Sequence, residues 1–513
     1  MIRAALSGVL SAAAGVAAAE LVAAGLDRPA AAPVFAVGGT VIDATPTPLK
    51  EFAVRTVGTY DKPLLLAGIG LGLVVIAAVI GVLARRRPFV ALLGAVAFGV
   101  VGIAAAVTRP TSQPVDVLPS LAGALVMGAA LVWTLRPAVS PPRVQSKELT
   151  SARVSPPGVQ SKAQSRRSFL GRAGVVALGA AAFGAGAFGI GRVRSGAAAR
   201  ARDAVTLPPP ADPAPPLPAG VGPAFYTRNA DFYRVDTALT VPAPDVDGWR
   251  LKITGMVDRP VELSFEDLLK RGLTERDITL NCVSNEVGGP YIGTARWLGV
   301  PLGQILREAG VQGGADQVVA RGSDGMTIGT PVTTVLDTAD AMLVVGMNGE
   351  PLPAVHGFPV RMLTPGPYGY AGSCKWITEL ELSTFDRFDA YWVERGWAPR
   401  GPVKTASRID RPAAFAKVPA GTVAVAGVAW AQGRGISAVQ VEVDGGGWRE
   451  ARLLPTASND TWTQWVYDWR ATAGAHSIRV RAVDGRGDVQ SGERATPFPS
   501  GATGWQTIAV TVT

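Results

Sequence analysis

Long apolar runs dominate the first 190 residues of the chain. Each run approaches the roughly 20 residues that an α-helix needs to cross a bilayer. A single run of this kind could be a buried core helix, but four or five within 190 residues argue against that alternative. The pattern predicts an N-terminal all-α transmembrane bundle, with helices near residues 4–26, 64–84, 89–107, 118–135 and 169–190.

Basic residues between these runs give the bundle an orientation. Arg85, Arg86 and Arg87 separate the second and third runs, and residues 136–167 carry seven more basic residues before the fifth run. Cytoplasmic loops of membrane proteins are enriched in Lys and Arg. We therefore expect a multi-pass protein of the cell membrane, with the N-terminus inside and the chain beyond residue 190 on the extracytoplasmic side. Most of the net charge of +9 then reflects topology, and a nucleic-acid partner is not expected.

A second signal precedes the fifth run. Ser165-Arg166-Arg167-Ser168-Phe169-Leu170 matches the twin-arginine export motif and leads into a Gly- and Ala-rich stretch. Paired arginines before a membrane helix are common, so the whole hexapeptide matters more than the pair. This export route carries folded proteins, which suits a domain that receives a cofactor before export. No cleavage site follows residue 190, and we expect the helix to remain as an anchor.

Beyond the membrane region, the pattern of polar and apolar positions changes twice. Mixed strands and short helices without a regular β-α-β alternation predict an α+β domain, and the last hundred residues show only strands and turns, which predicts an all-β immunoglobulin-like sandwich. The expected organisation is a four-helix membrane region (1–136), a cytoplasmic basic linker (137–167), a fifth transmembrane helix (168–191), a Pro-rich linker (192–224), the α+β domain (225–400) and the sandwich (401–513).

The chain contains two cysteines, Cys282 and Cys374, and two histidines, His356 and His476. This scarcity excludes a zinc finger, a four-cysteine iron–sulfur cluster and a bis-histidine haem inside the membrane. Cys282 follows a short apolar run and opens a polar, glycine-rich loop. Such a thiol suits a metal or cofactor, although a lone cysteine is more often structural.

An ordered set of motifs resembles the sulfite oxidase family of molybdopterin enzymes. The resemblance runs from about residue 225 to the C-terminus. Its motifs are Phe225-Tyr226-Thr227-Arg228-Asn229, Leu280-Asn281-Cys282, Ala295-Arg296-Trp297, His356-Gly357-Phe358-Pro359-Val360-Arg361, and Pro365-Gly366-Pro367-Tyr368-Gly369 leading to Lys375-Trp376. Each motif alone is weak, whereas their order is specific.

The resemblance implies a membrane-anchored enzyme that carries Mo-molybdopterin, with one molybdopterin per molybdenum. Cys282 would be the catalytic metal ligand, since soft thiolates suit such a metal. The pterin and its phosphate would be held by Arg228, Asn229, His356, Arg361, Ser373 and Lys375. On residue type alone, His356 could instead be a core histidine, and the basic residues could form surface salt bridges. His476 is expected to be structural.

The same resemblance implies two-electron oxygen-atom transfer to or from a small oxyanion or S-oxide. No cytochrome b5-like haem domain is recognisable, so a separate cytochrome or membrane redox protein would exchange the electrons. The C-terminal sandwich would form a homodimer. Cys374 could pair with Cys282 in a disulfide or remain a buried thiol, and the second alternative leaves the metal ligand intact.

Three departures from sulfite oxidases leave the substrate open. Asn285 and Glu286 stand where those enzymes carry basic residues, Ala230 replaces a histidine, and Met326 lies nearest the place of their active-site tyrosine. A methionine-sulfoxide (or other S- or N-oxide) reductase is therefore an alternative, although that branch resembles the catalytic domain alone. A third alternative is a non-catalytic receptor or assembly protein on the same fold.

Overall fold

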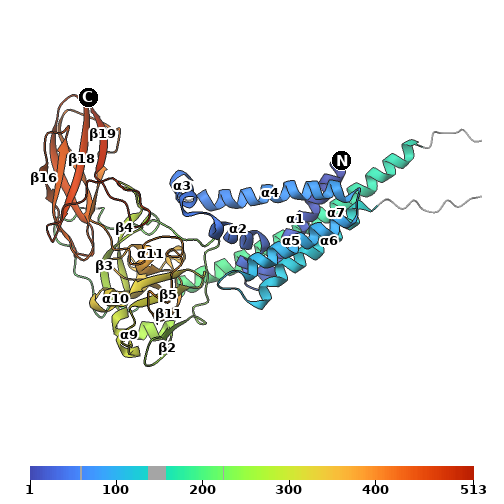
Figure 1. Ribbon diagram of the computed structural model, residues 1–513, viewed down its shortest axis with the longest axis horizontal. Helices are drawn as coiled ribbons and strands as arrows, with labels where there is room; N and C mark the ends of the chain where they lie inside the picture. Colours follow the sequence, from blue (N-terminus) through green and yellow to red (C-terminus); the bar gives the residue numbers. More distant parts are fainter. Residues whose placement is uncertain (58–59, 137–157, 223) are drawn as a thin grey trace, which may run out of the picture. The chain divides into compact units, whose positions relative to one another are not determined.

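The computed structural model describes residues 1–57, 60–136, 158–222 and 224–513 (Figure 1). These residues form two compact units. The first contains residues 1–197 and 237–240, and the second contains residues 198–236 and 241–513.

The first unit is helical, as the apolar runs predict. Five of its helices are long and apolar enough to cross a membrane, among the residues that the structure describes. Its elements are α1 (Ile2–Gly25), η1 (Pro29–Ala31), α2 (Pro33–Ala44), α3 (Thr47–Val57), α4 (Asp61–Ala84), α5 (Phe89–Val107), η3 (Pro114–Asp116), α6 (Val117–Leu135) and α7 (Gly158–Ala204).

Helix α7 is longer than the fifth predicted helix. Residues 192–204, which the sequence pattern assigned to the start of the Pro-rich linker, continue the helix to Ala204. Alanine and arginine dominate this stretch, and both favour helix, whereas Pro208 and Pro209 lie just beyond its end. At the other end, residues 158–167 of the predicted basic linker are helical, and residues 137–157 lie outside the described part of the chain.

Small residues let the helices of the first unit approach closely. A Cβ atom added at Gly15 of α1 would lie 2.7 Å from the Gly123 carbonyl oxygen of α6. Gly8 of α1 and Gly81 of α4 likewise have backbone of the other helix against them. Close backbone approach through small residues is typical of helix packing in a bilayer, where apolar side chains gain nothing from leaving lipid.

The second unit begins with two sheets that share the α+β part of the chain. The first sheet has the order β2-β1-β11-β5-β6, and the second has the order β10-β9-β7-β4-β3, with β8 beside β7. The strands are β1 (Arg250–Gly255), β2 (Val261–Ser264), β3 (Thr274–Asn281), β4 (Ile292–Pro301), β5 (Gln317–Gly322), β6 (Thr327–Pro331), β7 (Met342–Met347), β8 (Glu350–Pro351), β9 (Arg361–Leu363), β10 (Ser373–Cys374) and β11 (Ile377–Ser383).

Short helices connect these strands and end where the sequence places cap residues. The Ser264 side chain accepts a hydrogen bond from the Asp267 backbone, which fixes the start of α8. Gly310 ends α9 with a φ of 74°, a conformation that glycine adopts without steric cost. The helices are α8 (Phe265–Lys270), α9 (Leu302–Ala309), η4 (Ala354–His356), α10 (Val332–Asp337) and α11 (Gly369–Gly372).

Residues from 406 onward form an all-β region, as predicted. Eight strands follow the order β12-β14-β17-β16-β15-β18-β19-β13 around one buried core. They are β12 (Ala406–Arg411), β13 (Lys417–Val418), β14 (Gly421–Trp430), β15 (Ile436–Val443), β16 (Arg449–Leu453), β17 (Thr463–Ala471), β18 (Gly474–Asp484) and β19 (Gln506–Val512). Asp444 and Gly445 both have positive φ and form the turn between β15 and β16. The immunoglobulin-like identity of this region stays a prediction.

The all-β region and the α+β part are joined by hydrogen bonds at Thr279 of β3. The Thr279 backbone N–H donates to the Asp460 carbonyl at 2.9 Å, and the Thr279 hydroxyl accepts from the Trp462 backbone at 2.7 Å. The Trp462 indole donates to the Phe225 carbonyl at 3.1 Å, and the Gln432 amide donates to the Thr279 carbonyl at 3.0 Å. Strand β3 therefore pairs with β4 of the α+β part and also forms hydrogen bonds to loops of the all-β region.

Candidate functional site

Cys282 is the first residue after β3. Its side chain is 8% exposed, and its Sγ lies 2.9 Å from the Ser284 hydroxyl. Its backbone N–H donates to the Tyr291 carbonyl at 2.9 Å, which closes the loop between β3 and β4. Burial raises the pKa of the Cys282 thiol, while Ser284 and the Lys375 charge oppose that shift. The thiol is thus fixed in place and enclosed.

Both cysteines are free and buried, so the structure does not contain the alternative disulfide. Cys374 ends β10 and packs in the core of the α+β part. Burial raises the pKa of its thiol above the ordinary range, and the Asp324 carboxyl adds to the effect. Cys374 therefore fits the second alternative, a buried thiol.

The glycines after Cys282 serve contacts within the second unit. Gly288 has a φ of 79°, and a Cβ there would lie 2.6 Å from the Gln506 side chain of β19. A Cβ at Gly289 would lie 2.6 Å from the Asn285 amide oxygen, and the Gly289 carbonyl accepts a hydrogen bond from Arg408 at 3.0 Å. The structure places these glycines against the all-β region and the loop itself.

A buried cluster of polar residues lies on β9 and β10 and on the turn before them. Arg361 begins β9, is 7% exposed, and donates to the Ser373 hydroxyl at 2.6 Å and to the His356 carbonyl at 3.2 Å. No carboxylate pairs with Arg361 in the described part of the chain, and its Nε has no hydrogen-bond partner there. Burial lowers the pKa of Arg361 to about 10. A buried cation without an acidic partner is costly, so this position suits an anionic ligand.

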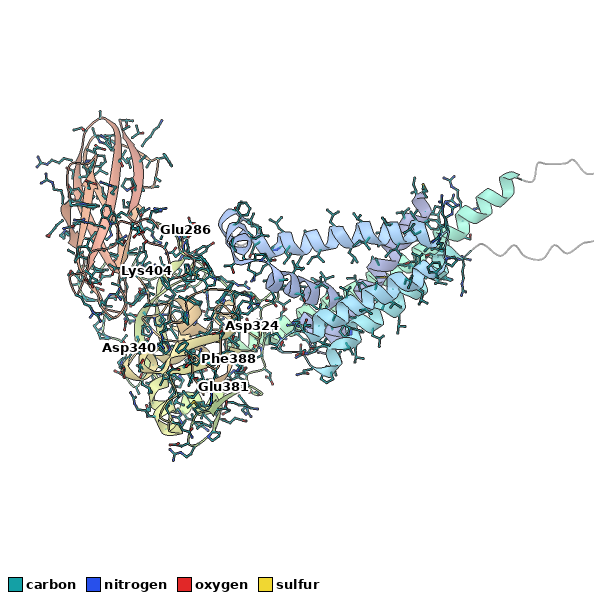
Figure 2. All side chains as sticks on the ribbon, viewed as in Figure 1. Glu286, Asp324, Asp340, Glu381, Phe388 and Lys404 are labelled. Carbon is teal, nitrogen blue, oxygen red and sulfur yellow. The ribbon has the colours of Figure 1, made fainter. Side chains whose placement is uncertain are left out.

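Lys375 adds a second buried cation. Its ammonium group donates to the Asp236 carboxylate at 2.6 Å and lies 4.8 Å from the centre of the Trp376 ring. Burial lowers the pKa of Lys375 to about 8; Asp236 opposes this shift, and the Arg361 charge adds to it. Asp324, labelled in Figure 2, is a further buried carboxyl whose pKa burial raises. Asp236 and Asp324 were missed from the sequence, because isolated acids in loops carry no motif.

His356 connects this cluster to the segment that begins near Phe225. Its Nε2 lies 2.9 Å from the Asn229 carbonyl oxygen, and burial lowers the pKa of the imidazole to about 4. The imidazole is therefore neutral at neutral pH and donates this hydrogen bond. Asn348 donates to the Asn229 side-chain oxygen at 2.8 Å, which orients that amide.

The structure brings most of the predicted cofactor residues together, with one exception. His356, Arg361, Ser373 and Lys375 share contacts, and Asn229 joins them through His356. Arg228 does not, because its side chain is 83% exposed and pairs with Asp231 at 2.6 Å. Arg228 opens a turn, in which the backbone N–H groups of Asp231 and Phe232 donate to the Arg228 carbonyl at 2.9 and 3.0 Å, and this turn brings the Asp231 carboxylate beside the guanidinium.

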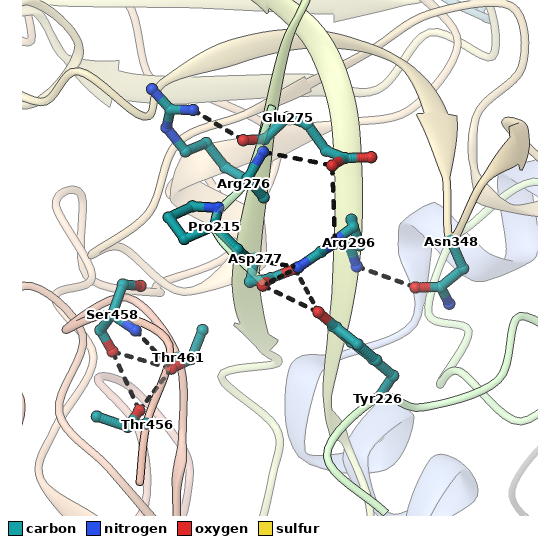
Figure 3. A network of polar contacts seen from close by, with 11 residues as sticks. Pro215, Tyr226, Glu275, Arg276, Asp277, Arg296, Asn348, Thr456, Ser458 and Thr461 are labelled. Carbon is teal, nitrogen blue, oxygen red and sulfur yellow. Dashed lines mark hydrogen bonds and ion pairs between the residues drawn. The ribbon is translucent and has the colours of Figure 1, made fainter. Parts of the chain in front are cut away.

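Figure 3 shows the polar network that holds the segment beginning at Phe225 on strands β3 and β4. Arg296 makes two hydrogen bonds of 2.9 Å to the buried Asp277 carboxylate, and the Tyr226 hydroxyl donates to the same carboxylate at 2.9 Å. The Arg296 backbone N–H donates to the Asn348 side-chain oxygen at 2.9 Å. Asn348 thus links this network to Asn229, and Asp277 fixes the segment on which the predicted ligands lie.

The donor set fits a phosphate-bearing pterin cofactor with a metal. In the described residues, no group of three or more His, Cys, Asp or Glu side chains could hold a metal ion. A metal at Cys282 would therefore take its other ligands from a cofactor. Besides the Arg361 Nε, the buried hydroxyls of Ser323 and Thr364 lack hydrogen-bond partners in the described part of the chain. Two buried cations and such unpaired polar atoms suit a phosphate and a polar ring.

Comparisons with known proteins agree with this chemistry. Residues 238–392 match the family model described as an oxidoreductase molybdopterin binding domain. Mitochondrial sulfite oxidase of Rattus norvegicus is 31% identical over 317 residues, which are 52% of this chain and 56% of that protein. The uncharacterized oxidoreductase YuiH of Bacillus subtilis (strain 168) is 30% identical over 179 residues, 35% of this chain and 82% of YuiH.

The solved structure of sulfane dehydrogenase SoxCD from Paracoccus pantotrophus aligns with a TM-score of 0.46 at 26% identity, over 52% of this chain and 76% of that one. The chain spans a little over half the length of rat sulfite oxidase, and it spans most of YuiH. Together with the matched domain, the sequence likenesses to sulfite oxidase and YuiH establish that the chain belongs to the sulfite oxidase family of molybdopterin-dependent oxidoreductases.

Proposed function

We propose that this chain is a membrane-anchored, extracytoplasmic oxidoreductase that carries Mo-molybdopterin and catalyses two-electron oxygen-atom transfer. The single observation that carries the proposal is the buried Arg361, which lacks a carboxylate partner in the described part of the chain and lies in one cluster with Ser373 and Lys375. This arrangement needs an anion, and the free Cys282 thiol lies within range of the Lys375 charge.

In the proposed complex, the Cys282 thiolate binds molybdenum, which supplies the redox chemistry. Arg361, Ser373 and Lys375 hold the phosphate, since a guanidinium and an ammonium both suit a dianion. Asn229 and His356 would face the pterin edges, and Arg228 would reach the cofactor only by leaving Asp231. These side chains bind and orient the cofactor.

Replacing Arg361 with Ala should reduce cofactor retention by roughly 30-fold or more, because truncating a buried, charged hydrogen-bond partner costs at least ~2 kcal/mol. Pterin fluorescence after denaturation measures the retained cofactor. Arg321→Ala is the matched control, since Arg321 pairs with Glu381 and stacks on Phe388, both labelled in Figure 2. Equal pterin in the Arg361 variant and the wild type would contradict the phosphate assignment.

Replacing Cys282 with Ala should remove the protein ligand to the metal, so that purified protein contains much less molybdenum than the wild type. Elemental analysis measures the content, and X-ray absorption reports how many sulfur atoms surround the metal. Cys374→Ala is the matched thiol control and should keep its molybdenum, because that side chain packs in the core. Unchanged molybdenum and sulfur coordination in the Cys282 variant would refute its role as ligand.

The loop after Cys282 favours a substrate with little negative charge. No basic residue lies between Cys282 and Tyr291, and Glu286 adds an acidic group (labelled in Figure 2). Asn285 is engaged in the loop itself, since its side-chain oxygen accepts from the Tyr291 backbone at 2.9 Å. Sulfite, an anion, is therefore a less suitable substrate than an uncharged S-oxide. This observation supports the second candidate function, reduction of methionine sulfoxide or a related S- or N-oxide.

A direct comparison of activities separates oxidation of sulfite, the first candidate function, from reduction of an S-oxide, the second. We expect the loaded enzyme to reduce methionine sulfoxide with reduced benzyl viologen at least ~10-fold more efficiently, by kcat/KM, than it oxidises sulfite with ferricyanide. Glu286→Gln should raise the efficiency with sulfite and leave that with the sulfoxide nearly unchanged, because only the anion is repelled. Faster sulfite oxidation by the wild type would favour the first candidate.

Contacts within the first unit support the predicted topology. Arg28, just after α1, donates to the Asp116 carboxylate at 2.7 Å and to the Thr111 carbonyl at 2.6 Å, both between α5 and α6. Arg194 of α7 pairs with Asp27 at 3.0 Å. All these residues are predicted to be extracytoplasmic. The Arg172 guanidinium, predicted near the cytoplasmic face, donates to the Arg136 carbonyl at 2.6 Å. In the twin-arginine motif, the side chain of Ser165 lies outside the described residues.

Single cysteines test this topology in intact cells. Cysteine in place of Val115, which is exposed between α5 and α6, should react with a membrane-impermeant maleimide, whereas cysteine in place of Arg86 should react only after lysis. The native thiols of Cys282 and Cys374 are buried and provide the unlabelled background. Labelling of the Arg86 position in intact cells would reverse the proposed orientation.

An exported enzyme of this kind needs an electron partner, which we propose is a separate cytochrome or membrane redox protein. The all-β region is proposed to be immunoglobulin-like and to form a homodimer. Its single core between the strands of β14 and β17 and those of β15, β18 and β19 supports a sandwich arrangement. The membrane helices would hold the enzyme beside its carrier.

A further inference from the structure

Tyr233 lies on the segment between Asn229 and Asp236, and its ring is fixed by aromatic neighbours. It stacks on Phe232 with ring centres 5.4 Å apart and meets the edge of Tyr291 at 6.4 Å. Phe232 in turn packs edge-on against Trp297 and His356. The Tyr233 side chain therefore belongs to a row of contacting rings that runs from His356, a predicted pterin residue, to Tyr291 at the end of the Cys282 loop.

The Tyr233 hydroxyl reaches the place where the Cys282 loop leaves β3. A Cβ atom added at Gly369 would lie 3.7 Å from this hydroxyl oxygen and 3.8 Å from the carbonyl oxygen of Asn281, the residue before Cys282. The charged or ionisable groups that act on Tyr233 are Cys282 and Arg361. Burial raises the pKa of Tyr233 well above the ordinary value, with Cys282 adding to the shift. The phenol therefore keeps its proton at physiological pH.

This hydroxyl makes no hydrogen bond within the described part of the chain, which sets it apart from the neighbouring tyrosines. Tyr226 donates to Asp277 at 2.9 Å, and Tyr370 donates to the Ala398 carbonyl at 2.5 Å. The Tyr368 hydroxyl accepts from the Lys404 backbone at 3.4 Å. The Tyr233 side chain is half-buried, so a hydroxyl without a protein partner on a ring held by aromatic neighbours can donate to a bound ligand.

We propose that the Tyr233 hydroxyl donates a hydrogen bond to an oxygen atom of the substrate beside Cys282. The assignment rests on the proposed function and adds a substrate-contacting residue that no motif marks. A neutral donor suits the oxygen of an uncharged S-oxide, which the loop without basic residues also favours. In the reduction of an S-oxide, the oxygen gains negative charge as its bond to sulfur weakens, so the hydrogen bond from Tyr233 strengthens along this direction of the reaction.

The test compares wild type, Tyr233→Phe and Tyr467→Phe as full-length, molybdenum-loaded proteins. Tyr467 lies on β17 in the all-β region and is the matched loss of one hydroxyl. Affinities for methionine sulfoxide and for sulfite are measured by calorimetry, together with molybdenum and pterin content. We expect Tyr233→Phe to keep its cofactor. It should bind whichever of the two ligands the wild type binds about 5-fold more weakly, and its kcat should also be lower. Tyr467→Phe should match the wild type.

Equal affinity and kcat in Tyr233→Phe and the wild type would overturn the assignment, and so would a loaded wild type that binds neither ligand. Loss of molybdenum or pterin from Tyr233→Phe would place the hydroxyl on the cofactor and would also overturn it. A wild type that contains no molybdenum would refute the proposed function itself. The last result differs from the others in the metal content, so the two failures are distinguishable.

Discussion

The candidate site depends on the buried guanidinium of Arg361 and on the hydrogen bonds that it makes. Its hydrogen bonds to Ser373 and to the His356 carbonyl fix β9, β10 and the turn before them in one arrangement. Because no carboxylate neutralises it in the described residues, the surrounding protein is arranged for an anion that comes from outside. Lys375 differs, since Asp236 already holds its ammonium group. A bound phosphate would have to share Lys375 with this carboxylate, whereas Arg361 is available as it stands.

The architecture was predictable where a local rule determines the structure. Apolar runs of membrane length became helices, Ser264 capped α8, Gly310 ended α9, and Asp444-Gly445 formed a turn. The rule failed where two signals competed. The Ala- and Arg-rich stretch after residue 191 was assigned to a linker because prolines follow it, yet helix propensity extends α7 to Ala204.

The site was predictable only as far as motifs extend. Ordered motifs named His356, Arg361, Ser373 and Lys375, and the structure brings these residues together. Motifs gave no information on Asp236, Asp324 or Tyr233, whose importance depends on which distant segments fold against them. They also could not indicate that Gly288 and Gly289 lie against Gln506 and Asn285, because a glycine in a loop looks the same whether it faces a ligand or a neighbouring side chain. Arg228 shows the converse, a motif residue whose side chain points to solvent in this structure.

The contacts between the Cys282 loop and the all-β region have a consequence for biosynthesis. Gly288 packs on Gln506, Gly289 bonds to Arg408, and Thr279 of β3 bonds to residues 460–462. A ribosome must therefore synthesise nearly the whole polypeptide before the loop gains its supports. Cofactor insertion into the finished loop is thus a late event, because the loop is supported by residues near the C-terminus. The proposed twin-arginine export would suit this order, because that route carries folded proteins.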